Sequence, residues 1–110
     1  MSYQITLLTP DGSFLEAFFI SNSLYQELIG IARIFELKHF SLAFLQKIKN
    51  RAFSTCSTQI KTNDPIIASA FASAALNWFD ELVVLIDSIS QLPQPNSISI
   101  YLNYLLSSFR

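Results

Sequence analysis

The residues of this sequence best suited to bind an anion lie in one stretch, residues 38–61, which we call the basic segment. This segment contains no Asp or Glu, whereas the residues before and after it hold all eight acids of the chain. Cations without neighbouring acids can bind a phosphate backbone, lipid headgroups or an acidic patch of another protein. The five cations of the basic segment are Lys38, Lys47, Lys49, Arg51 and Lys61.

Two of these cations are placed to act together. Lys47 and Arg51 are four residues apart, so on a helix they project from one edge, with Lys49 on the other. Like charges at this spacing repel by a few tenths of a kcal/mol, which suits a site that awaits an anion. The competing interpretation is that the cations only keep an amphipathic helix soluble. Nucleic acid is the less favoured anion, because no aromatic residues alternate with the cations and the net charge is −1.

The residues needed for catalysis or metal binding are scarce. The chain has one His, His39, and one Cys, Cys56, whereas a structural zinc site needs four such ligands. Asp80 and Glu81 are adjacent, so on a helix they point about 100° apart and do not converge on one reacting atom. No P-loop, dinucleotide fingerprint or nucleophile elbow occurs. We therefore expect no enzyme activity, no cofactor and no metal, unless a dimer places His39 or Cys56 beside a carboxylate.

The composition predicts a surface that another molecule covers. Hydrophobic residues make up 51% of the 110 residues and charged residues only 14%. A domain of this size has too much surface to hide that much apolar material, so we expect a second copy, another protein or a membrane to cover part of it. The longest apolar stretch, Pro65–Phe79, is shorter than the roughly 20 residues of a membrane span. With no signal peptide and a lone Cys56, the expected location is the cytoplasm.

The N-terminal residues predict a β-hairpin. Tyr3, Ile5 and Leu7 alternate with polar residues, as in a strand with one buried face. A turn at Thr9–Ser13 follows, and then an apolar strand, Phe14–Ile20, which we expect to be covered on both faces.

Two helices are predicted next. For the first, Ser21, Asn22 and Ser23 are N-cap candidates, and Ser23 with Gln26 fits a capping box. Gly30 within this helix suggests a close approach by another backbone. Its apolar stripe comprises Leu24, Tyr25, Leu28, Ile29, Ile31, Ala32 and Phe35. The second is short and follows a joint at His39 and Phe40, with Ser41 as its cap. Its apolar face comprises Phe44, Leu45, Ile48 and Ala52, and residues 54–63 are expected to form an exposed loop.

A long central helix is predicted over Asp64–Gln91. Asp64 and Pro65 suit its first positions, and Pro93 and Pro95 follow its end. Its paired apolar residues form a face broad enough for two neighbours. We expect self-association through this face, or through the edge of the hairpin. Small residues at four-residue spacing fit either a dimer contact or packing within one domain. The residues of the expected self-association face are Ile67, Phe71, Ala74 and Trp78.

The C-terminal residues 97–109 fit two patterns. Ile98, Ile100 and Leu102 alternate as in a strand, whereas Asn96 and Ser97 can cap a helix that extends to Phe109. We favour the helix.

These elements predict an α+β fold over one domain, residues 1–110, with the N-terminal hairpin packed on a layer of three or four helices. The expected function is that of a small non-enzymatic protein-interaction protein, which covers a surface of its partner and forms a homodimer. The alternative is a small nucleic-acid-associated regulator that uses the basic segment.

Overall fold

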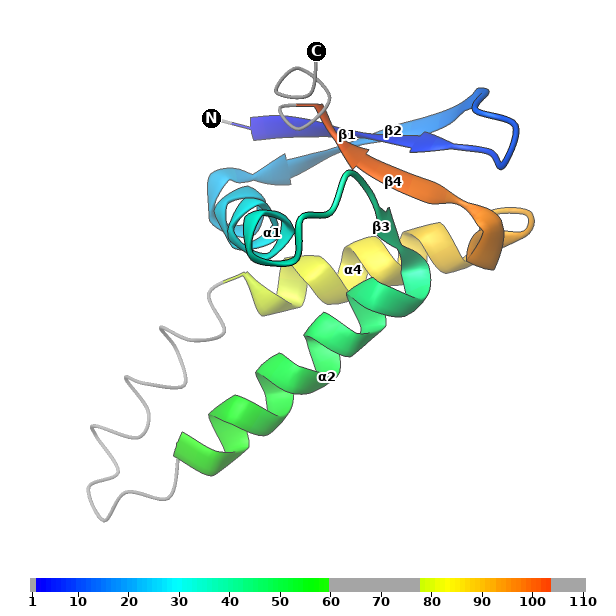
Figure 1. The fold of residues 1–110 in the computed structure, drawn as a ribbon. Helices are drawn as coiled ribbons and strands as arrows, with labels where there is room; N and C mark the ends of the chain where they lie inside the picture. Colours follow the sequence, from blue (N-terminus) through cyan, green and yellow to red (C-terminus); the bar gives the residue numbers. More distant parts are fainter. Residues whose placement is uncertain (1, 60–77, 104–110) are drawn as a thin grey trace.

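The computed structural model describes residues 2–59 and 78–103 of the chain, and over these residues it confirms the α+β class. Four strands form one antiparallel sheet in the order β2-β1-β4-β3. The three helices of the described part lie on one side of this sheet, and α2 packs beside α4 and extends away from the sheet (Figure 1). The elements are β1 (Ser2–Leu8), β2 (Phe14–Ser21), α1 (Asn22–Phe35), β3 (Phe40–Ser41), α2 (Leu42–Gln59), α4 (Phe79–Ser90), the 3₁₀ helix η1 (Pro95–Ser97) and β4 (Ser99–Leu102).

The N-terminal hairpin forms with the predicted turn. Gly12 has φ of 86°, a left-handed conformation that glycine adopts at little cost. The Asp11 carboxylate accepts hydrogen bonds from the Thr9 hydroxyl and, at 3.1 Å, from the Ser13 N–H. Since these bonds favour the charged carboxylate, they hold the pKa of Asp11 below its ordinary value of 3.8.

The prediction that the second strand is covered on both faces is wrong. Strand β2 lies at the edge of the sheet, paired only with β1. Ile20 faces the helices and is buried, but Phe19 lies opposite Gln4 on the other face and is 71% exposed. Phe14 is also exposed. The strand is apolar because one face packs on the core, while its other face remains open in the described structure.

The helix predicted for residues 97–109 is also wrong where the structure describes this segment. Ser99–Leu102 forms β4, a central strand that pairs with both β1 and β3. Asn96 and Ser97 do not begin an α-helix but belong to η1. Ile98, Ile100 and Leu102 are buried in alternation, so the period-two pattern was the informative one. Residues 104–109 lie outside the described residues.

Helix α1 begins two residues earlier than a Ser23 capping box requires, so the capping-box prediction is wrong and another of the N-cap candidates is confirmed. The N-cap is Ser21, whose hydroxyl accepts from the Leu24 N–H at 3.3 Å. Gln26 instead donates to the Asn22 side chain. A Cβ at Gly30 would meet no atom within 4 Å, so no backbone approaches closely there, contrary to our expectation.

Helix α2 is longer than predicted. Ser41 caps it as expected, accepting from the Phe44 N–H at 3.1 Å, and Phe40 in β3 is buried in the core. The helix continues to Gln59, so the expected loop is helical from Ser54 to Gln59. No Gly or Pro interrupts this stretch, and Ser and Thr are tolerated in a helix at modest cost. Residues 60–63 lie outside the described range.

Helix α4 represents the C-terminal part of the predicted central helix. It begins at Phe79, after Trp78 in the N-cap position, and ends at Ser90. Residues 64–77 lie outside the described residues, so the predicted length of this helix stays a prediction. Four apolar side chains of α4 are buried in the same core as the sheet: Leu82, Leu85, Ile86 and Ile89.

Candidate functional site

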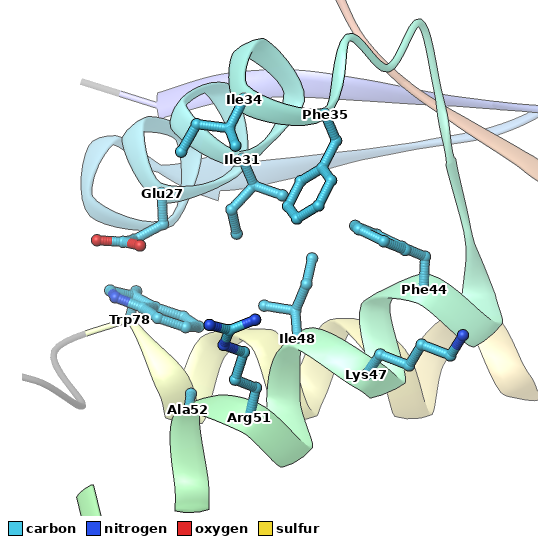
Figure 2. Close-up of a pocket in the computed structure, with 10 residues that line it drawn as sticks. All are labelled: Glu27, Ile31, Ile34, Phe35, Phe44, Lys47, Ile48, Arg51, Ala52 and Trp78. Carbon is cyan, nitrogen blue, oxygen red and sulfur yellow. The ribbon is translucent and has the colours of Figure 1, made fainter. Parts of the chain in front are cut away.

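An open groove of about 650 Å³ separates α1 from α2. Figure 2 shows apolar side chains from both helices facing each other across it, with Trp78 at one end. The apolar lining comprises Ile31, Ile34 and Phe35 from α1, Phe44, Ile48 and Ala52 from α2, and Trp78 before α4. Charged groups complete the lining: Glu27 from α1, with Lys47 and Arg51 from α2.

The groove is apolar because α1 has more apolar surface than its core contacts cover. Leu24, Leu28 and Ala32 are buried against the sheet and α4, whereas Ile34 is 77% exposed and Phe35 is 55% exposed. The predicted apolar stripe of α1 is therefore confirmed for its inner members, but Phe35 belongs to the groove.

Two local features fix the end of the groove opposite Trp78. Helix α1 stops after Phe35, because Glu36 adopts a left-handed conformation with φ of 53° and its N–H bonds back to the Ala32 carbonyl. The Phe35 ring then meets the Phe44 ring of α2 edge-on, with ring centroids 5.8 Å apart. This aromatic contact joins the two helices at one end and leaves the space between them open.

The two walls of the groove carry opposite charges. Lys47 and Arg51 lie on α2 one turn apart, and Arg51 extends into the groove (Figure 2). Glu27 lies on the α1 wall. All three side chains are exposed. The groove is therefore apolar at its centre, cationic along one wall and acidic on the other.

The structure brings together only part of the predicted basic site. Lys47 and Arg51 share one edge of α2, as predicted, and both line the groove. Lys49 is half-buried and is not part of the lining, and Lys38 lies in the connection between α1 and β3. Lys61 lies outside the described residues. Three residues of the expected self-association face also lie outside the described residues: Ile67, Phe71 and Ala74. The fourth, Trp78, lines the groove.

Glu81, one of the two adjacent acids that the sequence predicts not to converge on a reacting atom, positions α1. Glu81 of α4 accepts from the Ser21 N–H at 2.8 Å and from the Ser21 hydroxyl. Because Ser21 is also the cap of α1, this contact ties the start of α1 to α4. Sixty residues separate the two partners in sequence, and no local pattern signals such a pairing.

His39, the other candidate reactive residue that the structure describes, lies outside the groove. The ring of His39 is 5.4 Å from that of Tyr101, and His39 does not line the groove. The side chain of Cys56 is outside the described part of the structure. Within residues 2–59 and 78–103, no group of three or more His, Cys, Asp or Glu side chains could hold a metal ion. The groove itself offers apolar contact and charge, which are means of binding.

Comparison with known proteins gives no relative from which to infer a function. No protein-family model matches the chain, and neither the curated proteins nor the solved structures contain a match. Over the described part of the chain, no helix has the length and apolar character of a membrane span. What the protein does must therefore be inferred from the groove and its charges.

Proposed function

We propose that this is a small non-enzymatic protein-interaction protein of the cytoplasm, which binds a helix of a partner protein in the groove between α1 and α2. The observation that carries the proposal is the exposure of large apolar side chains along this groove, Ile34 and Phe35 above all. Exposed contiguous apolar surface on a small domain marks an interaction site.

The spacing of the lining residues fits a helical ligand. Phe44, Ile48 and Ala52 recur every four residues on α2, which sets a wall roughly 12 Å long. An amphipathic helix that presents apolar side chains at positions i, i+3, i+4 and i+7 has an apolar stripe of similar length. Two helices of the groove and one of the partner would then pack as three helices with a shared apolar interior.

The wall charges select among such helices. Lys47 and Arg51 favour a partner helix with acidic residues along the edge that faces α2. Glu27 disfavours acids along the other edge, so a partner helix with one acidic edge has a preferred orientation. We expect these exposed charges to act mainly on the association rate and on specificity, and the apolar contacts to supply most of the affinity.

Self-association is part of the proposal. Beyond the groove, Phe14 and Phe19 expose aromatic surface on β2, whose outer edge is unpaired within the described sheet. Two separate apolar surfaces on so small a chain support a homodimer in addition to a partner protein.

Nucleic-acid binding through the basic segment is the weaker proposal. Lys47 and Arg51 stand among apolar side chains, and Lys49 lies away from them. A phosphate-binding surface would instead gather cations and polar groups on one face. If nucleic acid were the ligand, affinity would fall steeply with salt concentration.

The test uses two designed helical peptides of about 20 residues, long enough to form helix on binding. Both have the same apolar stripe, but one has Glu and the other Lys along one edge. Fluorescence anisotropy of the labelled peptides should show that the Glu peptide binds. The affinity of the Lys peptide should be lower by roughly tenfold or more.

Two protein variants with the same change in net charge provide the control. Arg51→Glu should weaken the Glu peptide and strengthen the Lys peptide, because it reverses one charge of the groove. Lys49→Glu, on the same helix but outside the lining, should leave both affinities nearly unchanged. Equal binding of both peptides, or equal effects of the two variants, would show that the groove is not the binding site.

A further inference from the structure

We propose that the groove also binds the outer face of α4 from a second copy of this chain, so that the protein self-associates through two different surfaces. The inference rests on the proposed function of the groove and names an occupant for it.

The outer face of α4 is an amphipathic surface with its own charge. Asp80, Val83, Val84 and Asp87 are all exposed and stand at positions i, i+3, i+4 and i+7 of the helix. They lie opposite the buried side chains that hold α4 on the sheet and α2. Val84 is 65% exposed, which is unusual for a β-branched apolar residue at the middle of a packed helix.

This face and the groove are complementary in length and in charge. Asp80 and Asp87 are seven residues apart, about 10.5 Å along the helix, close to the roughly 12 Å of the α2 wall. The two valines project to either side of the line that joins the acids, so one would meet the α1 wall at Ile34 and the other the α2 wall at Ile48. The acids at either end would then lie within reach of the long side chains of Lys47 and Arg51.

The charge on the α1 wall fixes how the second copy sits. Glu27 repels Asp80 and Asp87, so the incoming α4 turns its line of acids from the middle of the groove toward Lys47 and Arg51 on α2. The contact joins two different patches, because the groove of one copy receives the outer face of α4 from another. It also occupies the groove, so self-association and the binding of a partner helix compete. Raising the concentration of free protein would therefore lower its affinity for the partner.

The experiment measures mass by sedimentation velocity at about 100 µM, where a contact of micromolar affinity is populated. The wild-type protein should sediment as two chains or more. The groove variant Lys47→Glu/Arg51→Glu should sediment as one chain, and so should the face variant Asp80→Asn/Asp87→Lys. Residue 80 is only neutralised in the face variant, because a cation in the first turn of α4 would oppose the helix dipole. Val84→Ser, which keeps every charge, should weaken the association as well.

Mixing the two charge variants is the decisive step. The groove variant keeps an intact α4 face and the face variant keeps an intact groove, so an equal mixture should contain a species of two chains. Self-association of either variant alone, or a mixture that remains at one chain, would overturn the proposal. A contact between two grooves would be broken by the groove variant alone, and pairing of β2 edges would survive both sets of substitutions.

The fluorescence of Trp78 distinguishes a failure of this self-association from a failure of the proposed function. It is the only tryptophan of the chain and lies at the groove, so its fluorescence emission reports on groove occupancy. Mixing the two variants should change this emission. The emission of either variant alone should stay the same when its protein concentration is raised. A protein that binds the Glu peptide but sediments as one chain at every concentration would leave the proposed function standing and remove this inference.

Discussion

The two sides of α1 use the same kinds of residue for opposite purposes. Toward the sheet, Leu24 and Leu28 are fully covered and form part of the core. Toward α2, Ile34 and Phe35 remain exposed along the groove, where the edge-on contact of Phe35 with Phe44 links the two helices. Residue type alone therefore does not separate a core face from a binding face. The difference arises from which neighbour each side of the helix meets.

The largest effect should come from the covered side. Leu28→Ala leaves a cavity between α1 and the sheet, and should lower the free energy of unfolding by about 2–5 kcal/mol. Denaturant unfolding followed by circular dichroism measures this loss. A loss below about 1 kcal/mol would mean that the covered side of α1 packs no more tightly than the groove side.

A smaller effect should come from the contact that positions α1. Ser21→Ala removes the cap of α1 and one partner of Glu81, and should cost about 1 kcal/mol. Glu81→Ala should cost a similar amount, and the double variant should cost less than the sum, because both changes remove the same contact. Strictly additive losses would show that Ser21 and Glu81 act independently.

The groove side should tolerate substitution. Ile34→Ser replaces an exposed side chain and should change the free energy of unfolding by no more than about 0.5 kcal/mol. The same variant should bind the designed Glu peptide markedly less well, since it removes apolar contact from the groove. If Ile34→Ser unfolds the protein, the α1 side of the groove is part of the core, and the two sides of α1 do not differ in role.

The smallest effect concerns the hairpin turn, at the sheet end of the molecule. Because the pKa of Asp11 is lowered in the folded protein, its contribution to stability is present above the unfolded value of 3.8. It is lost as the pH falls below that value, through the lower folded pKa. Thermal melts of wild type and Asp11→Asn should therefore differ slightly at neutral pH and converge in acid. A difference that grows toward acid pH would contradict the assigned hydrogen bonds.

Local patterns predicted those parts of the fold that depend on local physics. Alternation and a Pro-Asp-Gly turn were enough for the hairpin, and Ser41 was recognised as a cap because a cap acts within one turn. The β4 strand was mistaken for a helix because its pairing with β1 joins residues far apart in sequence, and only that pairing decides between the two patterns.

The candidate site was predicted in part for the same reason. The shared edge of Lys47 and Arg51 follows from helical spacing and was found from sequence. Trp78 was assigned to an apolar face, but nothing local placed it beside α2. Glu27 was not singled out, since a lone acid on a helix gains meaning only from the charges that face it across the groove.

Binding in the groove between α1 and α2 can be mapped residue by residue by NMR titration of the labelled protein with the Glu peptide. If the groove is the protein-binding site, the largest backbone and indole shifts should fall on Ile34, Phe35, Ile48 and Trp78, and Arg51→Glu should reduce them. Shifts centred on Phe14 and Phe19 of β2, with the groove unaffected, would contradict this assignment.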